Sequence, residues 1–254
     1  MSRLEAQAVS FSWPGRGELL SEVSLFLGAG RIIAILGANG AGKTSLLSVL
    51  AGRLRPNRGR VLVEGTLLSS LSPREIARRI AFLPQIERLP FNYPVLDFVL
   101  LGRAPHIPPL SLPGEEDYRA ARSALEEVGV AGLGERGAAT LSGGEFQLVR
   151  IARCLAQEAE ILLLDEPSAL LDPAHAASVA RQLSALAKSG KSVLVTTHDI
   201  GLAYSVADTI ILLHEGAVLD SGPAERLFDL GTLRKAFGAE FAQISLPSAY
   251  SPRS

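Results

Sequence analysis

The sequence contains very little cysteine, because Cys154 is the single cysteine among 254 residues. One thiol excludes both an intramolecular disulfide framework and a zinc site built from several cysteines. An excess of charge of one sign is also missing, since 25 Lys and Arg stand against 26 Asp and Glu, for a net charge of −1. Without an overall basic field, we expect no nucleic-acid partner.

Long hydrophobic runs are absent as well. No stretch reaches the ~18 uninterrupted apolar residues of a membrane span, because the best candidate, residues 91–103, is broken by Asp97 and Arg103. The first residues lack the apolar segment of a secretion signal. We therefore expect a chain that crosses no membrane by itself and that is long enough to bury a sizeable core.

Short apolar runs rich in Ile, Val and Leu predict the strands of a parallel sheet. Their lack of alternation is typical of strands buried on both faces. Helical periodicity lies between the runs, which predicts an α/β layered core. Strand-like pieces up to residue 65 predict an antiparallel sheet beside that core. The four runs cover residues 31–36, 161–167, 192–198 and 209–216.

A helical insertion is predicted after the antiparallel sheet. It covers roughly residues 88–140, where a proline-rich loop at 106–114 precedes a helical pattern between residues 118 and 128. We expect one domain over residues 1–240 and a loose C-terminal tail over residues 241–254.

Residues 37–44, GANGAGKT, match every fixed position of the phosphate-loop pattern G-x-x-x-x-G-K-[ST]. An apolar run precedes the motif and a helical pattern follows it. The three glycines permit backbone conformations in which N–H groups converge on phosphate oxygens. Lys43 would reach the β- and γ-phosphates, and the Thr44 hydroxyl would ligate Mg²⁺. An ordinary glycine-rich turn is the alternative, which the strand and helix context disfavours. The predicted nucleotide-binding residues here are Gly37, Ala38, Asn39, Gly40, Ala41, Gly42, Lys43, Thr44 and Ser45.

The apolar run at residues 161–164 ends in two acids, Asp165 and Glu166. A charge at the end of a buried strand is costly unless it has a partner, and in phosphate-loop enzymes that partner is the Mg²⁺ beside the triphosphate. We predict that Asp165 anchors the metal and that Glu166 acts as general base on an attacking water. A strand that simply runs into an acidic turn is the structural alternative.

With these two motifs placed, the chain resembles the ATP-binding subunits of bacterial ABC transporters. The sequence LSGGE resembles the signature of that family and lies upstream of the strand that ends in the two acids, as the family requires. It is the most specific feature of the chain. The residues of this signature, expected to contact nucleotide, are Leu141, Ser142, Gly143, Gly144 and Glu145.

Four more positions fall in the order that the family shows. Gln85 matches the glutamine loop, which contacts Mg²⁺ and senses the membrane partner, and Asp172 matches the D-loop. His198 matches the switch histidine that contacts the γ-phosphate, and Trp13 matches the aromatic that stacks on adenine. Each of these residue types, taken alone, more often has a structural role. The assignments therefore rest on the order in which the four positions and the motifs occur.

The resemblance covers roughly residues 4–240. It implies an α/β fold with a phosphate-loop NTPase core, an antiparallel β-subdomain and an inserted helical subdomain over roughly residues 88–160. It also implies ATP and Mg²⁺ as cofactors, and Lys43, Glu166 and His198 as catalytic residues. In the head-to-tail homodimer of the family, the signature of one protomer meets the γ-phosphate held by the other.

The same resemblance implies the partners and the location of the chain. The partners would be integral membrane permease subunits and an extracytoplasmic solute-binding protein. The chain itself would lie at the cytoplasmic face of the cell membrane as a peripheral subunit.

Residues 93–106 carry the sequence that indicates a branch of the family. Their last part, GRAPH at 102–106, resembles a segment of importer subunits that serve iron–siderophore, haem and vitamin B12 uptake, and His175 favours the same branch. The structural alternative is a proline-stiffened loop. The chain departs from the usual pattern at residues 168–170, at Leu148 and at Pro173.

We therefore predict an ATP-hydrolysing subunit that energises an importer of an iron chelate, haem or a cobalamin-type solute. The alternatives are an ABC exporter or lipid-trafficking ATPase subunit, and a soluble ABC ATPase that acts outside transport. The soluble class would need long coiled-coil heptads or a second cassette, and the sequence contains neither.

Overall fold

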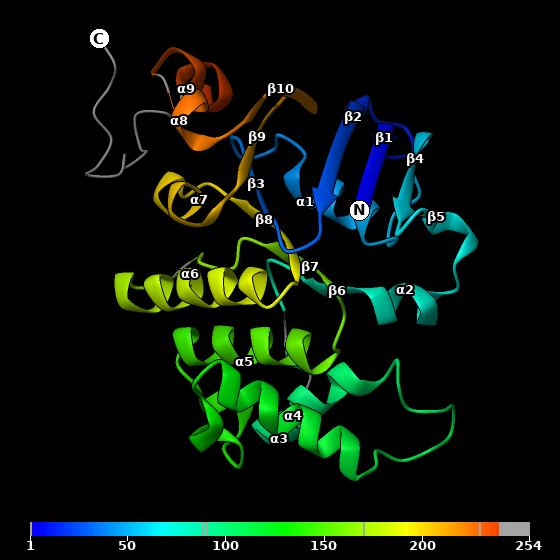
Figure 1. Ribbon diagram of the computed structural model, residues 1–254, viewed down its shortest axis with the longest axis vertical. Helices are drawn as coiled ribbons and strands as arrows, with labels where there is room; N and C mark the ends of the chain where they lie inside the picture. The colour runs from blue at the N-terminus through cyan, green and yellow to red at the C-terminus, as the bar shows by residue number, and fades with distance from the viewer. Residues whose placement is uncertain (1, 88, 90, 170, 229, 239–254) are drawn as a thin grey trace.

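The computed structural model describes residues 2–238 except 88, 90, 170 and 229, and within that part it contains two β-sheets (Figure 1). The smaller sheet has the strand order β2–β1–β4–β5, and every neighbouring pair is antiparallel. Its strands are β1 (Ser2–Ser12), β2 (Glu18–Gly28), β4 (Arg58–Val63) and β5 (Thr66–Leu67).

The larger sheet has the order β10–β9–β3–β8–β7–β6. Five of its strands run parallel, and β10 pairs antiparallel with β9 at one edge. Its strands are β3 (Ile32–Leu36), β6 (Ile80–Leu83), β7 (Ile161–Asp165), β8 (Ser192–Thr197), β9 (Thr209–His214) and β10 (Ala217–Gly222).

The parallel strands separate two hydrophobic cores. In β3, Ile33 and Ile35 pack in one core with α1 (Lys43–Leu50) and the antiparallel sheet, whereas Ile32 and Ala34 belong to the core on the other side. All residues of β3, β7 and β8 are buried, which explains why their sequences are continuously apolar instead of alternating. The four predicted parallel strands are confirmed.

Helices cover the second core. Figure 1 shows α3, α4 and α5 gathered at one end of the molecule, with α6 between them and the sheet. These helices and the last ones of the chain are α3 (Val95–Leu100), α4 (Glu115–Glu127), α5 (Gly143–Ala156), α6 (Pro173–Lys188), α7 (Ile200–Val206), α8 (Ala224–Leu227) and α9 (Leu230–Phe237). The helical insertion of the expected fold class is therefore present.

One further helix, α2 (Pro73–Arg79), leads into β6 and was not predicted. Ser72 caps it, and the Ser72 hydroxyl accepts a hydrogen bond from the Glu75 N–H while the Glu75 carboxylate accepts one from the Ser72 N–H. This reciprocal pair is the capping box that S-x-x-E sequences form. Strands β6 and β10 were also missed. The predicted tail at residues 241–254 lies outside the described residues.

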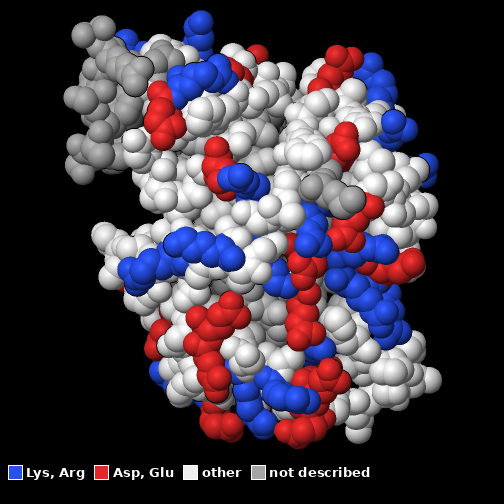
Figure 2. Space-filling model, viewed as in Figure 1, with Lys and Arg blue, Asp and Glu red and all other residues white. Residues whose placement is uncertain are grey.

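In the described part of the chain, none of the helices combines the length and the apolar character that a membrane span requires. On the face of the molecule shown in Figure 2, basic and acidic side chains lie side by side over much of the surface.

Candidate nucleotide-binding and catalytic site

The candidate site lies where adjacent parallel strands end. Leu36 of β3 pairs with Thr197 of β8, and Thr196 of β8 pairs with Asp165 of β7. The phosphate loop, the two acids and His198 therefore leave the sheet at the same edge. Ligands of open α/β sheets bind at this carboxyl edge.

The phosphate loop uses its glycines for two different reasons. Gly40 and Gly42 have φ values of 80° and 99°, in the left-handed region that side chains rarely adopt. Gly37 does not, but a Cβ built on it would lie 2.3 Å from the Leu213 carbonyl oxygen. The expectation that all three glycines provide unusual backbone conformations is therefore wrong for Gly37, which is required by a close approach to β9. Helix α1 begins at Lys43, so the helix predicted from the pattern after the motif is confirmed.

Lys43 is the cationic centre of the site. Its ammonium donates hydrogen bonds to the carbonyl oxygens of Gly37, at 2.7 Å, and Ala38, at 3.1 Å. The Nζ atom lies 3.8 Å from Glu166 Oε1. The side chain is 8% exposed, so its charge is screened less by solvent than that of a surface lysine.

A hollow of about 230 Å³ adjoins the loop. It combines backbone and side-chain donors from the loop with an acid that follows β7 and an amide that follows β6. Such donors suit a phosphate chain. The hollow is lined by Leu19, Asn39, Gly40, Gly42, Lys43, Thr44, Ser45, Gln85 and Glu166.

Asp165 has an oxygen that is left without a protein partner. Its Oδ1 accepts a hydrogen bond from the Thr196 hydroxyl at 2.5 Å, while Oδ2 is buried and has no hydrogen-bond partner among the described residues. Such a group is costly unless something outside the chain satisfies it. Thr44 and Gln85 line the hollow, and Asp165 at the end of β7 does not. The three side chains offer oxygen atoms, the ligand type that Mg²⁺ takes together with phosphates and water. No group of three His, Cys, Asp or Glu side chains suited to a metal occurs in the described residues.

Glu166 is buried beside an exposed imidazole. Its Oε2 lies 2.8 Å from His198 Nδ1, and its backbone N–H donates to the Thr196 carbonyl oxygen at 3.1 Å. The Glu166 residue is 6% exposed, whereas the His198 side chain is 61% exposed. The hydrogen bond to Glu166 raises the pKa of His198 above 6.5. The arrangement orients the carboxylate and leaves one side of the imidazole open to solvent.

The signature turn lies on the surface. Ser142 caps α5, and its N–H donates to Glu145 Oε2 at 2.8 Å; the hydrogen bonds from the backbone and hydroxyl of Ser142 lower the pKa of Glu145. Ser142 and Gly143 are exposed. A Cβ on Gly144 would lie 2.7 Å from the His175 ring. The signature lines no part of the hollow beside Lys43 within its own chain.

Asp172 and Trp13 have structural contacts of their own. Asp172 caps α6 by accepting hydrogen bonds from the N–H groups of Ala174 and His175, both at 2.9 Å, and these contacts lower its pKa. Trp13 is 42% exposed and packs edge-on against Phe11, with ring centroids 5.2 Å apart. Neither residue lines the hollow, so their roles toward nucleotide stay predictions.

The GRAPH segment clamps the C-terminal end of α5. Arg103 is 3% exposed, and its Nη1 donates to the carbonyl oxygen of Ala156 and to Glu158 Oε2, both at 2.7 Å. His106 Nε2 lies 2.9 Å from the carbonyl oxygen of Gln157. Because the last carbonyls of a helix lack partners within it, these contacts give the segment a structural role.

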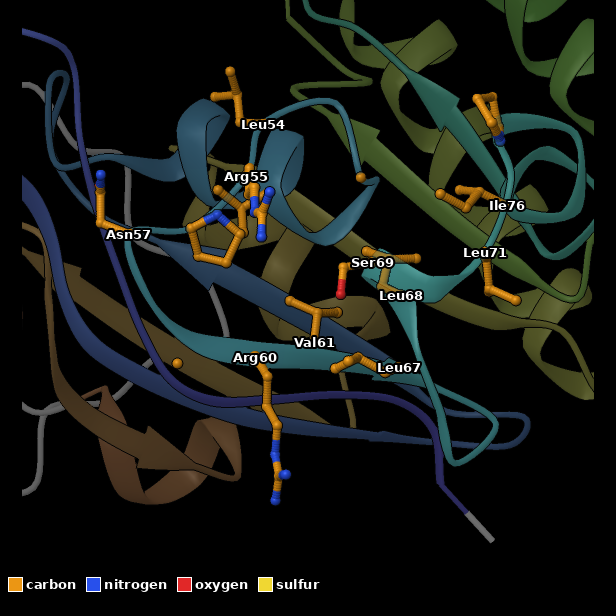
Figure 3. Close-up of a pocket in the computed structure, with 15 residues that line it drawn as sticks. Leu54, Arg55, Asn57, Arg60, Val61, Leu67, Leu68, Ser69, Leu71 and Ile76 are labelled. Atoms are coloured by element: carbon orange, nitrogen blue, oxygen red, sulfur yellow. The ribbon is translucent and has the colours of Figure 1, made fainter.

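A larger cavity, of about 650 Å³, lies elsewhere (Figure 3). It lies between the end of α1, the strand β4 and the start of α2, and it shares no residue with the hollow beside Lys43. Its walls are mostly apolar, and Arg55 and Arg60 at its edge are exposed. The buried charged residues Lys43 and Glu166 line the smaller hollow instead.

Sequence reasoning missed two parts of the site. Thr196 holds both Asp165 and the Glu166 backbone, and Leu19 of β2 brings the antiparallel sheet to the hollow. The polar pair Thr196 and Thr197 at the C-terminal end of β8 was a visible signal for Thr196. No sequence signal pointed to Leu19.

Comparison with known proteins supports the fold class. The sequence profile of the ABC transporter family matches residues 20–169. Hemin import ATP-binding proteins of Myxococcus xanthus and Deinococcus radiodurans are 38% and 40% identical, over 94% and 96% of this chain and 92% and 93% of theirs.

Solved structures of ABC proteins have the same fold as this chain. An inward-facing metal-chelate type ABC transporter is similar with a TM-score of 0.82 at 32% identity, over 93% of this chain and 89% of that one. A nucleotide-free ATP-binding cassette has a TM-score of 0.83 at 25% identity, over 94% and 100%. The fold and the site therefore define an ATPase with an ABC cassette. The chain belongs to the ABC transporter family.

Proposed function

We propose that this chain is the ATP-hydrolysing subunit of an importer whose solute is an iron chelate, haem or a cobalamin-type molecule. The observation that supports this most is the meeting of the phosphate loop, Glu166 and His198 at one sheet edge in a chain about 40% identical to hemin import ATP-binding proteins along nearly its whole length.

In the proposed mechanism, the loop amides and Lys43 bind the triphosphate. The ammonium exchanges its bonds to loop carbonyls for the β- and γ-phosphate oxygens. Thr44, Gln85 and Asp165 would hold Mg²⁺, which when bound neutralises charge on the phosphates. Glu166 accepts a proton from the attacking water, and His198 orients Glu166 and adds positive charge near the γ-phosphate.

A second copy completes the site in this proposal. The signature turn is exposed and lies outside its own hollow, and it begins α5, whose N-terminal N–H groups and dipole favour an anion. In a head-to-tail homodimer, Ser142 and Gly143 of one protomer would close over the γ-phosphate held by the other. Asp172 and Trp13 would contact the nucleotide at the edges of this sandwich.

Permease subunits and an extracytoplasmic solute-binding protein are the proposed partners, which places the chain at the cytoplasmic face of the membrane. The segment after Gln85 suits a protein contact, since Ile86 and Phe91 are 75% and 68% exposed. Exposed apolar side chains in one loop are typical of an interaction surface.

The test is uptake by cells in which Glu166→Gln replaces the native chain. Haem, a ferric siderophore and cobalamin are supplied separately, and affinity purification of the tagged chain identifies the co-purifying membrane protein. We expect loss of uptake of one of the three and recovery of a permease. Normal uptake of all three would contradict the proposed solute class, and absence of any permease would contradict the transport role.

A further inference from the structure

A buried guanidinium connects residues 84–87, called here the glutamine segment, to α5, the helix that begins with the signature. Arg150 on α5 is 5% exposed. Its Nη1 donates to Gln147 Oε1 at 2.6 Å, its Nε donates to Glu87 Oε2 at 3.1 Å, and its Nη2 donates to the Pro84 carbonyl oxygen. The planar group therefore bridges acceptors of two segments that lie more than 60 residues apart in sequence.

The connection continues to the catalytic carboxylate. Gln147 is 6% exposed, and its Nε2 donates to the Pro167 carbonyl oxygen at 2.7 Å. Pro167 directly follows Glu166, and Pro84 directly precedes Gln85. Two buried side chains thus join the backbone before Gln85 to the backbone after Glu166. Buried hydrogen bonds of this kind are costly to leave unmade, so the path is stiff.

Residues 147 and 150 lie three positions apart, so they share one face of α5. The N-terminal end of the same helix carries the signature turn. The bridge therefore fixes three parts of the site relative to one another: the glutamine segment, the base and the helix that bears the signature.

We propose that Arg150 and Gln147 are positioning residues for ATP hydrolysis, which hold Gln85 and Glu166 in one fixed relation. This inference rests on the proposed function. A displacement of the glutamine segment moves Pro84, and the bridge passes that displacement to Pro167 and so to the base. The planar fork of the guanidinium is essential, because a lysine ammonium presents no such fork.

Arg153, one turn further along α5, provides a matched control. Its Nη1 donates to the other oxygen of Glu87, and its guanidinium lies 4.8 Å from the centroid of the Phe98 ring. Within the described part of the chain, it hydrogen-bonds to neither Pro84 nor Gln147.

The experiment compares Arg150→Lys with Arg153→Lys in the full-length chain. Both variants keep the positive charge beside Glu87. We expect Arg150→Lys to lower kcat about tenfold through misplacement of the base, with the affinity for a fluorescent ATP analogue unchanged because the phosphate loop is untouched. Arg153→Lys should keep wild-type kcat. Equal kcat in Arg150→Lys and wild type, or an equal loss in both variants, would overturn the proposal.

Gln147→Met tests the other half of the bridge and leaves the contacts of Arg150 with Glu87 and Pro84 in place. We expect the same loss of kcat, and no further loss in the Arg150→Lys, Gln147→Met double variant, because both changes break one path. Multiplicative losses would show two independent effects and overturn the proposal. Failure of this test differs from failure of the proposed function, since the latter would appear as unaffected transport in Glu166→Gln cells.

Discussion

At the scale of single residues, the chemistry depends on how Glu166 is held. The carboxylate lies between the exposed imidazole of His198 and the buried ammonium of Lys43. Both neighbours restrict the orientation of the carboxylate. A base held in this way is ready to accept a proton from a water that approaches the γ-phosphate.

Glu166→Gln removes the proton acceptor and keeps the size of the side chain. We expect kcat to fall by at least about 100-fold, the contribution of a well-placed general base, while ATP binding persists and an ATP-bound dimer accumulates. Turnover assays and size-exclusion chromatography with MgATP measure both effects. Glu160→Gln, just before the other end of β7, is the control and should hydrolyse ATP normally. Normal turnover in Glu166→Gln would rule out its role as base.

His198→Gln should change the pH dependence of stability. Because Glu166 raises the pKa of His198 above 6.5 in the folded chain, the stabilisation by this pair is present below the unfolded pKa and is lost as pH rises through the raised value. The difference in free energy of unfolding between wild type and variant should therefore be larger near about pH 6 than near about pH 9. Guanidinium unfolding at both pH values measures it, and an equal difference at both would contradict the assignment.

At the scale of elements, α5 links the signature turn to the rest of the helical subdomain. Its N-terminal end carries the signature, its middle carries the bridge of Gln147 and Arg150, and its C-terminal end is clamped by the GRAPH segment. The position of the signature therefore depends on contacts at the far end of the helix. The GRAPH sequence has a structural reason that is independent of the transported solute.

Gly102→Ala tests this clamp. A Cβ at residue 102 would lie 2.2 Å from the Arg153 carbonyl oxygen, so the segment must move away from α5. We expect a loss of about 1–3 kcal/mol in the free energy of unfolding, as for overpacking. Gly132→Ala is the matched control, because nothing lies within 4 Å of a Cβ there. Thermal and denaturant unfolding measure the free energy of unfolding of both variants. Equal values for the two variants would contradict the clamp.

The sequence predicted elements where one physical signal dominated. Apolar runs predicted the parallel strands, and the motif GANGAGKT predicted a strand, a loop and α1. The sequence pattern did not predict β6, which has only four residues. It did not predict β10 either, whose residues are mostly half-exposed and apolar only in part. The capping box at Ser72 was a readable signal that was overlooked.

The candidate site was predictable to a similar degree. Lys43, Asp165 and Glu166 belong to local motifs, so spacing alone placed them. The partners that hold them come from other strands, and contacts such as Thr196 with Asp165 depend on strand order. The bridge from Arg150 to Pro84 also joins distant segments, and no local pattern encodes it.

At the scale of the whole molecule, the proposed dimer takes two separate surfaces from each chain. One is the hollow beside Lys43, and the other is the exposed signature turn at Gly143, which does not line that hollow. In two copies related by a two-fold axis, the hollow of each copy would face the signature turn of the other, because such an interface repeats every contact. The proposed dimer therefore has two equivalent composite sites.

A mixing experiment tests this claim most directly. Lys43→Ala disables the phosphate loop. Gly143→Arg blocks the signature at an exposed position, where nothing lies within 4 Å of an added Cβ. Each variant alone should be inactive, because every composite site of the proposed dimer contains one defect. A mixed dimer has one site with both defects and one site with none, so an equal mixture should regain about one quarter of wild-type ATPase activity. A mixture as inactive as its components, or a Gly143→Arg chain that hydrolyses ATP alone at the wild-type rate, would contradict a site shared between two copies.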